Sequence, residues 1–106
     1  MRVIKNKIIP AKGFAAINLF GVVFTRKENL SGQTLRHESI HTAQMRELAY
    51  IFFYVWYGIE YAIRLIWYRN RKEAYRNISF EREAYRYDKV DNYLSKRTWC
   101  SFLNYL

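Results

Sequence analysis

The chain has 106 residues, of which 51% are apolar and 19% aromatic, and its formal net charge at pH 7 is +9. A chain this apolar is not intrinsically disordered, and its length favours a single domain over residues 1–106. The only cysteine, Cys100, excludes a disulfide framework and a multi-cysteine zinc finger.

Short strands are predicted in the first quarter of the chain. Residues 2–9 are typical of a strand that Pro10 would end, because proline cannot donate to a sheet. Residues 14–26 are rich in β-branched and aromatic types, which indicates one strand or two strands bent at Gly21. We therefore expect a short antiparallel β-hairpin or meander at this end.

Helices are predicted in the remainder. Ser31 or Asn29 would cap a first helical region, which meets no helix breaker before Gly58 and forms one or two helices. A further helix is expected over residues 80–95, and residues 98–106 show helical spacing of their apolar side chains. The predicted class is α+β, with the β-hairpin or meander followed by three or four helices.

Residues 48–68 form an apolar, aromatic block. Twelve residues from Leu48 to Ile59 carry no charge, which is too few for a bilayer span of about 20 residues. Glu60 and Arg64 interrupt the longer run. Three interpretations remain open: a buried core helix, a helix or hairpin at a membrane interface backed by the cations of residues 69–72, and a true span.

The cations avoid this block. Of 18 lysines and arginines, seven lie in residues 1–36, ten in residues 64–97, and only Arg46 falls between. Nucleic-acid binders more often interleave cations with the surface that reads the bases, so we expect an anionic membrane surface and no nucleic acid as partner. No apolar run of secretory type follows the charged residues 1–7, which predicts a cytoplasmic protein, peripheral on the inner face of the membrane.

Both histidines of the chain lie in one motif, His37-Glu38-Ser39-Ile40-His41. Residues i and i+4 share a helix face, so both imidazoles could bind one zinc ion. Glu38 lies about 100° further round the helix and need not be a ligand. It could instead act as general base towards a water that the metal activates. The alternative is a pair of solvated surface histidines with an intervening glutamate.

A hydrolytic zinc site needs a third protein ligand, and no third histidine exists. The best source is the start of the predicted helix 80–95, where Glu81 and Glu83 offer carboxylates and the small Ala84 allows close helix packing. A helical wheel slightly favours Glu83. Both carboxylates could also serve only the dipole of a helix N-terminus.

A His-Glu-x-x-His motif followed by Glu81-Arg82-Glu83-Ala84 resembles the gluzincin metallopeptidases. The run from His41 to Gln44 is also similar to small uncharacterised zincin-like domains of bacteria. The resemblance covers roughly 20 residues. It implies a minimal zincin-like core with zinc as cofactor and a peptide or protein as substrate. In it, His37, His41 and Glu81 are the ligands and Glu38 is the catalytic base.

The chain departs from that family at Tyr85, where the family has an aspartate that orients a metal-bound histidine. The Tyr85 phenol could accept this bond weakly, or Asp88 could substitute. Gln44 lies on the histidine face and could contact substrate or only support the site. By the resemblance, residues 17–24 would form a wall where an extended peptide docks as an added strand.

The predicted function is a zinc-dependent metallopeptidase that hydrolyses peptide bonds with a metal-activated water and Glu38 as general base. The alternative is a non-catalytic metal-binding or membrane-surface interaction module that retains the zincin core.

Overall fold

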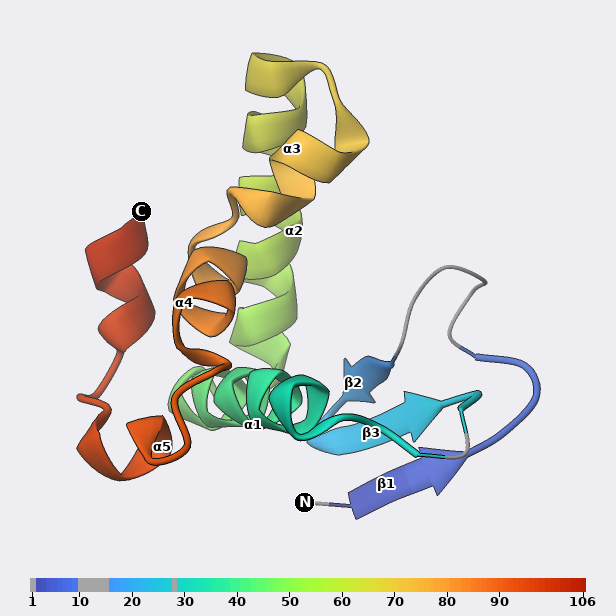
Figure 1. The fold of residues 1–106 in the computed structure, drawn as a ribbon. Helices are drawn as coiled ribbons and strands as arrows, with labels where there is room; N and C mark the ends of the chain where they lie inside the picture. Colours follow the sequence, from blue (N-terminus) through green and yellow to red (C-terminus); the bar gives the residue numbers. More distant parts are fainter. Residues whose placement is uncertain (1, 10–15, 28) are drawn as a thin grey trace.

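A small sheet followed by helices makes up the fold, which confirms the predicted α+β class (Figure 1). The computed structural model describes residues 2–9, 16–27 and 29–106, so the predicted role of Pro10 and the start of the strand 14–26 lie outside the described residues. The elements are β1 (Arg2–Lys5), β2 (Ile17–Leu19), β3 (Val22–Thr25), α1 (Gly32–Glu47), α2 (Ile51–Tyr68), α3 (Arg71–Arg76), α4 (Ser79–Tyr87), α5 (Tyr93–Lys96) and a 3-10 helix, η1 (Ser101–Tyr105).

The sheet has β3 at its centre, in the order β1-β3-β2. β2 and β3 form an antiparallel hairpin whose two turn residues, Phe20 and Gly21, have φ of 54° and 88°. Positive φ at both positions is what a type I′ hairpin turn requires. The predicted residues 14–26 thus give two strands that turn at Gly21.

β1 differs from the predicted antiparallel arrangement, because it pairs with β3 in parallel. β2 already occupies the other edge of β3, and the connection from Lys5 to Val22, which includes β2, is long enough to join parallel strands. β1 also ends before the predicted residue 9. The Asn6 side-chain oxygen accepts hydrogen bonds from the backbone N–H groups of Ile8 and Ile9 at 2.8 and 2.6 Å, which turns the chain out of the sheet.

The first predicted helical region is two helices. Ser31 caps α1 as expected, its hydroxyl oxygen accepting from the Thr34 N–H at 3.1 Å. α1 then ends, because Ala49 and Tyr50 have positive φ, and α2 runs on through Gly58. In the part of the chain that the structure describes, no helix is both long and apolar enough to cross a membrane.

The helix predicted over residues 80–95 is also divided, since α4 ends at Tyr87 and α5 begins at Tyr93. Asp88, which follows Tyr87 at the end of α4, is buried and directs its carboxylate to His37 and Gln33 on α1. Residues 98–106 form only one helical element, η1. Phe102 on η1 is buried, whereas Trp99, which precedes η1, is exposed.

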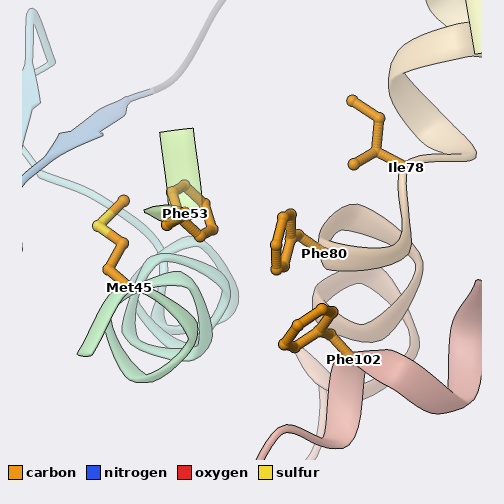
Figure 2. Close-up of a cluster of buried hydrophobic side chains, with 5 residues drawn as sticks. All are labelled: Met45, Phe53, Ile78, Phe80 and Phe102. Atoms are coloured by element: carbon orange, nitrogen blue, oxygen red, sulfur yellow. The ribbon is translucent and has the colours of Figure 1, made fainter. Parts of the chain in front are cut away.

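The core lies between α1, α2, α4 and η1 (Figure 2). Phe80 is fully buried, with its ring centroid 4.6 Å from that of Phe53 and 4.5 Å from that of Phe102. Met45 and Ile78 complete the cluster. Because Glu81 follows Phe80 on α4, the packing of this ring also fixes where the Glu81 carboxylate lies.

A buried carboxylate from another helix caps α4. Glu60 on α2 accepts hydrogen bonds from the backbone N–H and the hydroxyl of Ser79, both at 2.6 Å, and from the Trp56 indole at 3.1 Å. A negative group at a helix N-terminus satisfies free N–H groups and interacts favourably with the helix dipole. Glu60 thus holds the start of α4 against α2.

We expect Phe80→Ala to lower the free energy of unfolding by about 3–5 kcal/mol, because it leaves a cavity at the centre of the aromatic cluster. Urea unfolding monitored by circular dichroism measures the change. The control is Trp99→Ala, at a position 75% exposed, which should cost no more than about 0.5 kcal/mol. Equal costs for the two variants would contradict this core.

Candidate metal centre

Three side-chain atoms from α1 and α4 converge on one point. His37 and His41 stand one turn apart on α1, with their Nε2 atoms 3.1 Å from each other. Oε1 of Glu81 on α4 lies 3.1 Å from Nε2 of His37 and 3.0 Å from Nε2 of His41. All three residues are buried.

The outer nitrogens of the two imidazoles are held by oxygen acceptors. Nδ1 of His37 lies 2.9 Å from Oδ2 of Asp88, and Nδ1 of His41 lies 2.8 Å from Oε1 of Gln44. The Gln44 amide nitrogen donates to the Phe80 carbonyl and to Glu83, which leaves its oxygen for His41. Each Nδ1 therefore carries a hydrogen, and each Nε2 is free to direct a lone pair at the Glu81 oxygen.

Two nitrogen lone pairs and a carboxylate oxygen at such short range need a cation between them. Imidazole nitrogen and carboxylate oxygen are zinc ligands, and tetrahedral zinc with bonds of about 2.0–2.1 Å separates its ligand atoms by about 3.3 Å. The observed separations of 3.0–3.1 Å are close to this value. The donor set formed by His37, His41 and Glu81 fits a zinc ion.

Without a metal, a proton takes the place of the cation. Burial opposes the charge on His41, but the charge and hydrogen bond of Glu81 outweigh burial and raise the pKa of His41 to about 9. Burial likewise opposes the charge on Glu81, but the charge of His41 and the hydrogen bonds of both histidines hold the pKa of Glu81 below its usual range. In the metal-free protein, His41 and Glu81 therefore form a buried ion pair.

A cavity of about 440 Å³ borders the centre. Glu38, His41 and Glu81 line it together with apolar and aromatic side chains from β2, α1 and α2. Ligand atoms of His37, Glu38 and His41 lie within 4.8 Å of one another. Burial raises the pKa of the Glu38 carboxyl, the two histidines lower it and Glu81 raises it, with a net rise. A carboxylate with a raised pKa is a better base than an exposed one.

Neighbouring elements fix the orientation of this site. The Tyr57 hydroxyl on α2 donates to Oε2 of Glu81 at 2.7 Å, so that Oε1 is the oxygen left for the histidines. Burial raises the pKa of Tyr57, which keeps the phenol a donor. Asn18 on β2 donates to the Glu38 carbonyl at 2.9 Å and to the Thr42 hydroxyl at 2.8 Å, and so ties the sheet to α1.

Tyr57 and Asn18 are not among the site residues predicted from the sequence. Tyr57 is one tyrosine among many in an aromatic block, and no motif marks either residue. The only signal that could have pointed to Tyr57 is its place on a helix expected to pack in the core.

Of the two candidate carboxylates, the structure brings Glu81 to the histidines. Glu83 is bound instead to Arg97 at 2.5 Å, to Gln44 and to Tyr93. Its position on the same short helix places it on the side facing the C-terminal segment, where Arg97 also binds Glu47.

Of the two groups considered for orienting a histidine, Asp88 makes the bond to His37. The Tyr85 ring packs edge-on against His37 with centroids 4.4 Å apart, and its hydroxyl lies 3.0 Å from that of Tyr75. Gln44 accepts a hydrogen bond from Nδ1 of His41 through its side-chain oxygen, and it does not line the cavity.

No family model, curated protein or solved structure matches this chain. The gluzincin resemblance therefore rests on the two sequence motifs and stays a prediction. What the chain offers independently of any relative is the geometry of the centre and of the cavity beside it.

We expect the metal-free protein to lose stability as the pH rises from about 6.5 to 9. Folding raises the pKa of His41 from 6.5 to about 9, so its contribution to stability is complete below pH 6.5 and is lost as the pH passes through 9. Urea unfolding in the presence of a chelator, over this pH range, measures the loss. His41→Asn should remove most of this pH dependence, and an equal slope in both proteins would contradict the pairing.

Proposed function

We propose that the protein is a zinc-dependent metallopeptidase of gluzincin type, in which His37, His41 and Glu81 hold the metal and Glu38 is the general base. The observation that carries the proposal is the convergence of the three ligand atoms beside a cavity whose wall includes His41, Glu81 and Glu38. A structural zinc site is closed, whereas a catalytic one keeps a position open to water or substrate.

Each group has a role that follows from its contacts. Zinc, when bound, lowers the pKa of a water and polarises a carbonyl group. Glu38 accepts the proton of the attacking water, and burial favours this by raising the pKa of its carboxyl. Asp88 and Gln44 fix the imidazole rings through Nδ1, which increases the basicity of the ligating nitrogens. Tyr57 donates to Oε2 of Glu81, which would leave Oε1 as the oxygen available to the metal.

The cavity favours a peptide with a bulky apolar side chain. Its lining includes Ile17, Leu19, Met45, Phe53 and Tyr54. β2 is an edge strand, because the sheet order leaves one of its sides without a partner strand among the described residues. An extended peptide could therefore pair with β2 at residues 17–19 and place a side chain in the cavity. β3, in the centre of the sheet, has no free edge, so the docking wall expected over residues 17–24 is limited to β2.

The first test is the metal content of the purified protein. We expect about one zinc per chain by elemental analysis, lost in His37→Ala and strongly reduced in Glu81→Gln. Glu73→Gln, an exposed carboxylate on α3, is the matched control and should retain the metal. If the wild-type protein neither contains zinc nor takes it up, the proposal fails.

The second test separates catalysis from metal binding. We expect Glu38→Gln to lower cleavage of a peptide library by roughly 100-fold or more, because it removes the general base, while the zinc content is unchanged. Ser39→Ala, the adjacent half-buried residue of α1, serves as control and should retain activity. Zinc binding without cleavage by the wild-type protein would favour the non-catalytic metal-binding module.

A further inference from the structure

The outward face of α2 is apolar along its whole length. Seven large apolar side chains on this helix are between 54% and 77% exposed. They are Ile51, Phe52, Val55, Ile59, Ile63, Ile66 and Trp67, which we call the α2 stripe. Scattered exposed apolar residues are ordinary, but a continuous set on one element marks an interaction surface.

These residues share one side of the helix. At about 100° per residue the stripe covers an arc of about 160° and runs for about 24 Å. The two charged residues of α2 lie outside the arc. Glu60 is buried and accepts hydrogen bonds from Ser79, and Arg64 is half-buried. The opposite side of α2 packs Phe53 into the core, with α3 and α4 alongside (Figure 1).

Cations and aromatic rings lie at the end of the stripe. Trp67 and Tyr68 close α2, and the exposed Arg69, Arg71 and Lys72 follow. The only acidic residue from 69 to 76 is Glu73, and Arg76 adds a further cation. Tryptophan and tyrosine favour the boundary between acyl chains and headgroups, and lysine and arginine are attracted to anionic lipids.

We propose that the α2 stripe docks on an anionic lipid surface, with α2 lying in the plane of the interface. An amphipathic helix in this position buries its apolar side to about 5–10 Å. The exposed cations that follow α2, Arg69, Arg71 and Lys72, would reach the headgroups. Charge decides against a second copy of the chain as occupant, because each copy carries +9 and would bring its own cations to the contact. This inference does not depend on the proposed peptidase activity.

The test is cosedimentation of the full chain with vesicles. We expect binding to vesicles of phosphatidylcholine with phosphatidylglycerol, and much weaker binding to phosphatidylcholine alone. Ile59→Ser/Ile63→Ser should weaken binding by roughly tenfold or more, because both side chains are exposed and would enter the lipid. The matched control is Val90→Ser/Leu94→Ser, which removes exposed apolar side chains outside α2 and should bind as the wild type does.

A second pair of variants tests the charge. Arg71→Gln/Lys72→Gln should weaken binding, whereas Lys89→Gln/Lys96→Gln, which removes two exposed cations elsewhere, should have a smaller effect. Added salt should weaken binding of the wild type. His37→Ala, once shown by circular dichroism to be folded, should bind vesicles as the wild type does, so failure of the zinc site and failure of this proposal are distinguishable.

Two results would overturn the proposal. One is equal vesicle binding by the Ile59→Ser/Ile63→Ser variant and the wild type, each shown by circular dichroism to be folded. The other is a lipid-independent dimer of the wild type, detected by analytical ultracentrifugation, that the same variant converts to monomer. The latter would assign the α2 stripe to contact between copies of the chain.

Discussion

The contact of two histidines with one carboxylate is the constraint on which the structure depends. His37, His41 and Glu81 are buried, and burying charge is costly unless it is compensated at short range. Compensation requires that α4 approach α1 closely at one position. Ala84 on α4 is completely buried and small, which permits this approach, and the ring of Phe80 fixes the rotation of α4.

The polar groups around the centre extend this constraint to the rest of the fold. Asp88 ends α4 by binding α1, and Gln44 joins α1 to α4 through Phe80 and Glu83. Beyond Glu83, Arg97 binds the carboxylates of both Glu83 and Glu47, and so attaches the C-terminal segment to α1 and α4. A network in which every member has a partner is rigid, whereas one with an unpaired member is strongly destabilised.

The class of the fold and the helix that carries the motif could be predicted because local patterns determine them. The cap at Ser31 and the turn at Gly21 are examples. The parallel placement of β1 and the end of α4 at Asp88 could not, because each depends on a partner distant in the sequence. The choice of Glu81 over Glu83 follows from the resemblance to the gluzincin motif, but not from the periodicity of the helix. A helical wheel gives the face of one helix, but Arg97, fourteen residues further on, decides which carboxylate turns away from the histidines.

The distribution of polar and apolar residues is the reverse of that expected for a small domain. Among the described residues, thirteen polar or charged residues are buried against nine apolar ones, and sixteen large apolar residues are exposed, seven of them on α2. A buried polar interior costs stability and is retained where the site has a use, which is consistent with a metal centre. An apolar exterior loses hydrophobic stabilisation unless another surface covers it. α2 joins the two, because its inner side brings Tyr57 to Glu81 while its outer side carries the α2 stripe. A surface that covers the stripe would therefore stabilise the same helix that orients Glu81.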